Sequence, residues 1–324
     1  MRPTDERSTY PVPVRAAEVG VDQQMLRLTA ASGPQHLLLT LLGDYWYPRF
    51  DAVLSAALVD LLAEFEVSEA NTRAVLSRMS RKELLVAGRQ GRRTTYALSP
   101  SAMRTLHEGT RRIFTFGDYS AGWDGRWTLV AFSIPEENRS IRSTLRIRLG
   151  WEGFASLFDG VWVAPGARAE AAARLVNKLG VDMATILVGR SSDLVPGGSP
   201  TRAWDLRGLQ GRYEAFIRSF APVAERIAGE EPGEREALII RTAVIDAWRG
   251  FPAVDPELPG ELLPDGWPQS RARELFTSIY DSLGPSASTR FREVLARRDP
   301  DSAALVAHHS STDALQLCTE ADTT

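Results

Sequence analysis

The sequence is poor in the residue types that form covalent cross-links and metal centres. Its 324 residues include one cysteine, Cys318, so it can form neither an internal disulfide nor a metal site built from cysteines. The four histidines show no ligand spacing, and we interpret His308 and His309 as part of a polar tail rather than as a zinc site. We therefore expect neither a metal site nor a cofactor.

Long apolar runs are absent as well. No window has the roughly 18 consecutive apolar residues of a membrane span. The first residues, MRPTDERSTYPVPVR, also lack the apolar core of a signal peptide. We therefore expect a cytoplasmic protein without a membrane partner.

Charge is distributed unevenly along the chain. The formal net charge is -3, yet residues 71–93 carry seven lysines or arginines and one acid. Residues 225–265 have the opposite balance, with ten acids and four bases. A basic segment in an acidic chain indicates contact with a polyanion such as DNA. The acidic segment would be repelled by DNA, so we expect it to serve dimerisation and control.

The basic segment begins with an amphipathic helix. Ser68 is placed to cap it, because a short hydroxyl side chain can accept from the free amides of the first turn. Thr72, Val75, Leu76 and Met79 recur at the spacing of one buried helical face. The opposite face is small along its centre and cationic at its margins. It carries Ala70, Arg73, Ala74, Ser77, Arg78 and Arg81, with Asn71 at its edge.

This outward face is typical of a recognition helix. Small side chains let a helix approach the floor of the major groove, and arginines at the rim can reach phosphates or guanine edges. The alternative is an ordinary solvated helix without a partner.

After Leu84 the hydrophobic period changes from that of a helix to that of a strand. Apolar runs at 84–87 and 94–98 flank a basic turn, in which Gly91 can adopt the positive φ of a tight hairpin. A recognition-type helix followed by a basic hairpin indicates a winged helix-turn-helix. The candidate DNA-binding residues are Ser68, Asn71, Arg73, Ser77, Arg78, Arg81, Lys82, Arg89, Gln90, Arg92 and Arg93.

The segments around this motif complete the first domain. Residues 1–31 are polar and proline-containing, and we predict a flexible arm. The domain itself should span residues 32–117. Its first helix should start at Pro34 and stop at Gly43, its second should start near Val53, and a connector helix should begin at Ser99 or Ser101.

A composition change at residues 123–125 marks a second domain, over 118–200. Short apolar strands are predicted at 127–134, 160–163 and 183–188, with helices at 138–151 and 167–179 between them. This β-α-β-α-β order indicates a ferredoxin-like middle domain. A helical C-terminal domain should follow over 201–299, and then a flexible tail over 300–324. The fold class is thus α+β.

Five separated segments carry a resemblance to a known family, the PaaX repressors of phenylacetic acid catabolism and their relatives. They lie between residues 37 and 280, in the order in which the family has them. They are LLLTLLGDY at 37–45, RAVLSRMSRKELL at 73–85, GRQGRRTTYALS at 88–99, WDGRWTLVAFSIPEENRSIRSTLR at 123–146 and AVIDAWRGFPAVDPELPGELLPDGWP at 243–268.

The resemblance implies a homodimeric repressor of three parts: a winged helix-turn-helix, a ferredoxin-like middle domain and a helical C-terminal domain. In the family's founding members an aryl-acetyl-coenzyme A thioester releases the DNA. Two departures are visible here. Glu83 stands where glycine is more usual at the turn into the wing, and residues 1–31 have no family counterpart that we identify.

The leading hypothesis is therefore a non-enzymatic, ligand-responsive regulator of a catabolic operon. It would bind an inverted-repeat operator in double-stranded DNA and be released by a small effector such as an acyl-CoA. We expect that ligand between the middle and C-terminal domains. Four arginines of the middle domain could bind the phosphate of an acyl-CoA, or they could form an ordinary solvated helix face. They are Arg139, Arg142, Arg146 and Arg148.

Two other classes of function stay open. Ferredoxin-like folds occur in a small CRISPR-associated nuclease family, whose chemistry needs an aspartate near the end of the first strand to hold a divalent cation. Here Glu136 is the nearest acid. The other alternative is an interaction protein whose basic helix binds a partner other than DNA.

Overall fold

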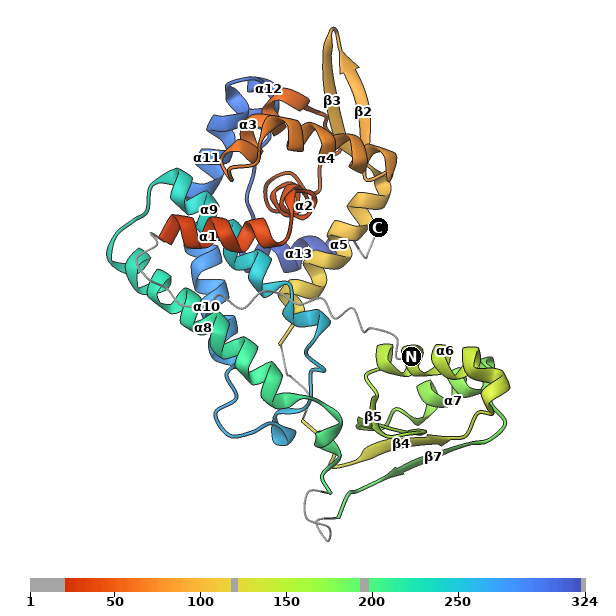
Figure 1. Cartoon of the computed structure of the whole chain (residues 1–324). Coiled ribbons are helices and arrows are strands. Elements are labelled where there is room, and N and C mark those ends of the chain that lie inside the picture. The colour runs from red at the N-terminus through yellow and green to blue at the C-terminus, as the bar shows by residue number, and fades with distance from the viewer. Residues whose placement is uncertain (1–20, 118–121, 193–197, 322–324) are drawn as a thin grey trace. The chain divides into compact units, whose positions relative to one another are not determined.

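The computed structural model describes residues 21–117, 122–192 and 198–321 (Figure 1). It contains helices and two small sheets, as expected for an α+β chain. The chain forms two compact units. The larger comprises residues up to 116, 214–253 and 270 onward, and the smaller comprises residues 117–213 and 254–269. This division differs from the expected three consecutive domains, because helices from both ends of the sequence pack together in the larger unit.

In the larger unit the N-terminal helices surround α2 (Pro34–Tyr45), which is buried along most of its length (Figure 1). Pro34 occupies its first turn, but the helix continues past Gly43 to Tyr45, so the predicted stop is wrong. A Cβ at Gly43 would lie 3.2 Å from Leu106 Cδ2, so this glycine lets the next helix approach closely. The helices are α1 (Val21–Ala31), α2 (Pro34–Tyr45), α3 (Ser55–Ala63), α4 (Glu69–Arg81) and α5 (Pro100–Thr115).

A three-stranded antiparallel sheet belongs to the same unit. Its strands are β1 (Val53–Leu54), β2 (Leu85–Gln90) and β3 (Arg93–Leu98), in the order β1-β3-β2. The helix predicted from Val53 thus starts two residues later, after a short strand that pairs with β3.

The predicted N-terminal arm is wrong over its last eleven residues. These residues form α1, which packs against the C-terminal helix α9 (Glu234–Trp248). Met25 and Leu26 are buried. Their apolar side chains, with Thr29 one turn later, form a helical stripe that the polar composition of the segment obscured. Residues 1–20 lie outside the described part of the chain.

The C-terminal helices complete this unit. α9 is apolar and buried on nearly all sides, and Phe216 and Phe220 of α8 are buried, as their shared spacing predicts. The predicted flexible tail is wrong, because α12 (Pro300–Ala304) and α13 (Ser311–Ala321) follow, and Ala303, Ala314 and Val306 between the two helices are buried. Asp299 caps α12 by accepting from the Ser302 amide at 3.2 Å. The remaining helices are α8 (Leu206–Gly229), α10 (Gln269–Ser282), α11 (Gly284–Ala296), α12 (Pro300–Ala304) and α13 (Ser311–Ala321). Residues 206–213 of α8 belong to the smaller unit.

The smaller unit is a four-stranded antiparallel sheet with two helices. Its chain order is β-α-β-β-α-β, so the predicted order missed one strand, β5 (Ala155–Phe158). That strand has only four residues, and alternate ones are exposed, which left no apolar run to detect. The elements are β4 (Trp127–Phe132), α6 (Arg139–Trp151), β5 (Ala155–Phe158), β6 (Val161–Pro165), α7 (Ala169–Lys178) and β7 (Ala184–Gly189), and the strand order is β5-β6-β4-β7.

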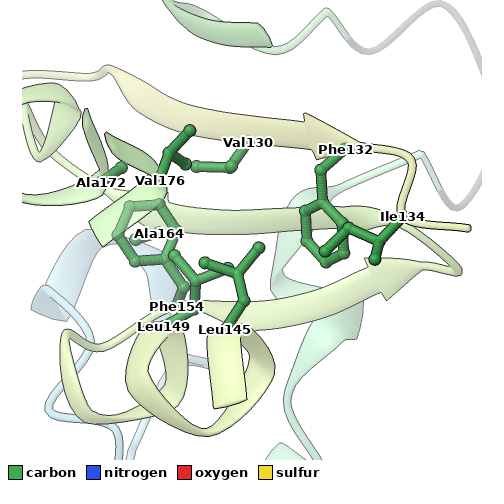
Figure 2. Close-up of a cluster of buried hydrophobic side chains, with 9 residues drawn as sticks. All are labelled: Val130, Phe132, Ile134, Leu145, Leu149, Phe154, Ala164, Ala172 and Val176. Atoms are coloured by element: carbon green, nitrogen blue, oxygen red, sulfur yellow. The ribbon is translucent and has the colours of Figure 1, made fainter. Parts of the chain in front are cut away.

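The core of this unit lies between the helices and one face of the sheet (Figure 2). Val130 and Phe132 of β4 face Leu145 and Leu149 of α6, and Ala172 of α7 closes the same cluster. Burial of these apolar side chains provides the main driving force for the packing of helices on the sheet.

A buried arginine joins both ends of the chain in the larger unit. Arg241 of α9 has no exposed surface, and its Nη1 lies 3.5 Å from Oδ2 of Asp44 on α2. Its Nε donates to the Tyr280 carbonyl at 3.0 Å, and its Nη2 donates to the His309 carbonyl at 2.7 Å. The guanidinium carbon also lies 3.7 Å from the centroid of the Tyr280 ring. One side chain thus connects α2, α9, α10 and the C-terminal segment.

Removing the acid from this site should strongly destabilise the protein. Asp44→Ala leaves the Arg241 cation buried without its counter-ion, and we expect a loss of about 3–5 kcal/mol in unfolding free energy. Adding Arg241→Met should recover part of the loss, since the unpaired charge is then gone. Denaturant unfolding of the three proteins measures this. A loss within about 1 kcal/mol for Asp44→Ala would contradict the importance of the pair.

Candidate nucleic-acid interface

The predicted amphipathic helix that follows Ser68 is confirmed as α4. Ser68 caps it, with its Oγ accepting from the Asn71 amide at 3.4 Å. The buried side chains are those that the periodicity predicts: Thr72, Val75, Leu76 and Met79. The opposite face, predicted to be small and cationic, is exposed to solvent.

Two helices, α3 and α2, pack against the buried face of α4. The opposite face of α4 therefore lies on the outside of the larger unit. The connection from α3 has no glycine, and Glu66 adopts a positive φ of 61° there. Amides of the turn donate to the end of α3, from Val67 to the Leu62 carbonyl at 3.2 Å and from Glu66 to the Ala63 carbonyl at 3.1 Å. These bonds hold the strained turn and set the angle at which α4 begins.

The turn from α4 into the hairpin depends on Glu83. This residue stands where the family resemblance predicts glycine, and it adopts a φ of 57°. Its carbonyl accepts from the hydroxyls of Ser99 at 2.6 Å and Ser101 at 2.8 Å, both at the start of α5. Ser99 also caps α5, accepting from the Ala102 amide at 3.1 Å. The entrance to the hairpin is therefore bonded to the start of the connector helix.

The hairpin is longer than predicted. β2 and β3 pair in register from Leu85–Leu98 to Gln90–Arg93, so the turn consists of Gly91 and Arg92 alone. Gly91 has a φ of 61°, the conformation expected for it. Figure 1 shows this hairpin extending away from the helices of its own unit. Most of its residues are exposed, including the apolar Val86.

Ion pairing distinguishes the cations of this surface. Arg73 is paired with Glu69 one turn earlier, at 2.7 Å, and Arg81 donates to Ser77 Oγ at 3.2 Å. For the others, the described part of the chain contains no acid or hydrogen-bonding partner. These five unpaired cations are Arg78, Lys82, Arg89, Arg92 and Arg93. Together they make one end of the larger unit positive, which suits an anionic partner.

The structure brings the candidate residues together on α4 and the hairpin, and all of them are exposed. Ser68 and Asn71 lie at the start of α4, and Arg89 and Gln90 lie in β2 instead of in the turn.

Sequence reasoning missed one neighbouring cation. Arg27 of α1 is exposed and lines, with Gln23, a groove of about 600 Å³ that reaches Ser68 and Asn71. It was missed because residues 1–31 were expected to be a flexible arm. The buried stripe of α1 was the signal that places Arg27 on the outer face.

Comparison with known families covers most of the chain. Residues 34–102 match the PaaX-like protein family, residues 120–200 match the PaaX protein central Cas2-like domain, and residues 204–293 match the PaaX-like protein C-terminal domain. The chain belongs to the PaaX family. The PaaX match at 34–102 contains α4 and the hairpin.

Relatives of this PaaX family member include a curated protein and a solved structure. The transcriptional repressor PaaX of Escherichia coli is 28% identical over 258 residues, which cover 78% of this chain and 80% of that protein. The structure of an uncharacterized protein from Mycobacterium tuberculosis is similar with a TM-score of 0.50 and 24% identity. The likeness covers 80% of this chain and 97% of that chain. It shows a shared fold.

Substituting glycine for Glu83 should stabilise this PaaX family member. The left-handed conformation costs a side-chain-bearing residue about 1–2 kcal/mol, and the greater freedom of glycine in the unfolded chain offsets about 0.5–1 kcal/mol of that gain. We expect Glu83→Gly to raise the unfolding free energy by about 0.5–1 kcal/mol in denaturant titrations. Glu83→Ala removes the charge and retains the strain, so it should give no such gain. Equal gains from both variants would assign the effect to charge.

Proposed function

We propose that this protein is a DNA-binding transcriptional repressor, in keeping with its curated relative in Escherichia coli. The observation that carries the proposal is the group of five unpaired cations on α4 and the hairpin. Arginines and lysines without acid partners are free to replace the counterions of DNA phosphates.

In this proposal the larger unit carries a winged helix-turn-helix, and α4 lies in the major groove. Its exposed centre contains Ala70, Ala74 and Ser77, which are small enough for close approach. Arg78, near the end of the helix, would reach a base edge or a nearby phosphate. The hairpin would act as the wing, with Arg92 at its tip against the backbone. The smaller unit would be a ferredoxin-like domain without DNA contacts.

Further features of the proposal follow from the family's repressor function. A cytoplasmic, non-enzymatic homodimer would present two copies of α4 to an inverted-repeat operator, and a small effector would release it. Among the described residues no helix is long and apolar enough to cross a membrane.

The nuclease alternative is not favoured. The acid nearest the end of the first strand of the smaller unit, Glu136, is paired with Arg142 at 3.0 Å. Within the described ranges no group of three or more His, Cys, Asp or Glu side chains could hold a metal ion. The remaining alternative is a partner other than DNA. The salt dependence of duplex binding distinguishes it from the proposed function.

Binding to the DNA upstream of its own coding sequence tests the proposal. Fluorescence anisotropy at several salt concentrations should show tighter binding to this DNA than to a scrambled duplex. Log affinity should fall linearly with log salt, at about -0.9 per phosphate contact. Equal binding to both duplexes would oppose a repressor function, and no binding to either would favour the partner alternative.

Arg78→Ala should weaken specific binding more than non-specific binding. If Arg78 contacts a base, its loss should cost about 1–3 kcal/mol at the operator and relax the base preference at one position. Binding to a set of single-site operator variants measures both effects. Arg174→Ala on α7 is the control, because it removes an exposed cation from the smaller unit. Unchanged affinity and preference in Arg78→Ala would contradict the assigned orientation of α4.

Arg92→Ala should instead weaken all sequences alike. A phosphate contact carries no base information, so operator and scrambled DNA should lose affinity by the same factor. The slope of log affinity against log salt should become shallower by about 0.9. A loss confined to the operator would show that the tip reads bases rather than the backbone.

A further inference from the structure

A half-open cavity of about 580 Å³ lies in the larger unit, and α4 and the hairpin contribute no residue to its lining. Its walls come from α2, α5, α13 and the end of α9, elements that are far apart in the sequence (Figure 1). α13 packs against α5 and forms one wall. The volume is within the range of about 300–1,000 Å³ that small-molecule sites have.

Most of the cavity wall is apolar, but one buried hydroxyl has no partner. Leu39, Leu106, Ile113 and Ile245 provide apolar surface. Thr40 also lines the cavity and is only 9% exposed, and its Oγ1 makes no hydrogen bond. A buried hydroxyl without a partner costs free energy, so a ligand oxygen or nitrogen that reaches Thr40 would relieve that cost.

The cavity also has a cation that no acid neutralises. Arg112 of α5 donates to the Pro252 carbonyl, and no carboxylate in the described residues pairs with it. Arg249 differs, because Asp246 lies 2.6 Å from it and also accepts from Ser32. Burial lowers the pKa of His36, and the nearby Arg249 lowers it further, which disfavours the cationic form of this side chain. Arg112 therefore supplies the uncompensated positive charge.

We propose that this cavity is the effector site and that it binds a small carboxylate with an apolar body. The apolar body would fill the space between α2 and α5, the carboxylate would pair with Arg112, and Thr40 would donate a hydrogen bond. This inference rests on the proposed repressor function. It places the effector in the larger unit, whereas the sequence indicated a site between the middle and C-terminal domains. The arginines considered there include Arg142 and Arg146, which are paired with Glu136 and Asp159.

The walls of the cavity are joined to the proposed DNA-binding surface. α2 packs against the buried face of α4, and α5 starts at the serines that hold the Glu83 carbonyl. A ligand that binds α2 and α5 more tightly in their DNA-free arrangement would shift both α4 and the hairpin. By linkage, the carboxylate must weaken DNA binding by the same factor by which DNA weakens carboxylate binding.

Calorimetry on the full chain tests the site without DNA. The probes are octanoate, 4-phenylbutyrate and the uncharged 4-phenylbutyramide. We expect saturable binding of at least one carboxylate, with the amide about tenfold weaker than 4-phenylbutyrate because it lacks the charge. Arg112→Gln should weaken carboxylate binding about tenfold and abolish the preference over the amide, and Arg112→Lys should preserve that preference. Thr40→Val should weaken both phenyl probes several-fold.

Arg111→Gln is the matched control, since Arg111 is exposed like its neighbour Arg112 but does not line the cavity. Its affinities should equal those of the unaltered chain, and thermal melts verify that each variant folds. No saturable binding of either carboxylate, or equal losses in the Arg111 and Arg112 variants, would overturn the site. If the protein bound a carboxylate but no DNA, the repressor function would be overturned, whereas the ligand site itself would still be supported. DNA binding that the bound carboxylate does not change would overturn its role as effector.

Discussion

The larger unit depends on the buried charge of Arg241. An arginine without solvent contact needs hydrogen-bond acceptors and a neutralising charge, and Arg241 has acceptors for its Nε and Nη2 and a carboxylate beside its Nη1. Here the partners come from α2, α10 and the segment before α13, so the charge is compensated only when these elements are assembled. Tyr280 completes the arrangement by donating from its hydroxyl to Asp44 at 3.1 Å. Burial raises the pKa of Asp44, and the nearby Arg241 and the Tyr280 hydroxyl oppose this shift.

A second ionic cluster anchors the helix that precedes α4. Glu64, at the end of α3, is 8% exposed at its side chain and binds Arg290 of α11 at 2.8 Å and Arg235 of α9 at 3.1 Å. Like Arg241, it connects an N-terminal helix to C-terminal ones. This explains why the C-terminal helices do not form a separate unit, although their sequence matches a distinct family domain. The C-terminal helix α11 packs against α3, and α3 in turn packs against α4.

Local signals made the proposed DNA-binding surface predictable. The cap at Ser68, the spacing from Thr72 to Met79 and the glycine at position 91 each act within one turn or one hairpin, so the sequence alone reveals them. The ionic clusters and the cavity could not be predicted in this way. Arg241 and Asp44 are separated by almost 200 positions along the chain, and nothing in either local sequence marks them as partners. β5 was missed because it is only four residues long, and α1 because its apolar residues lie in a mostly polar segment. In both, tertiary packing decides which side chains are buried.

Two strained turns bound α4, and this constrains how it can move. Glu66 before the helix and Glu83 after it both hold positive φ values that cost side-chain-bearing residues about 1–2 kcal/mol each. Each is held by hydrogen bonds to a neighbouring element, to α3 in the first case and to α5 in the second. A change that tilted α4 would have to break or reform these bonds. Its orientation is therefore coupled to α5, and a ligand that contacts α5 could change it without touching any residue of α4 or the hairpin.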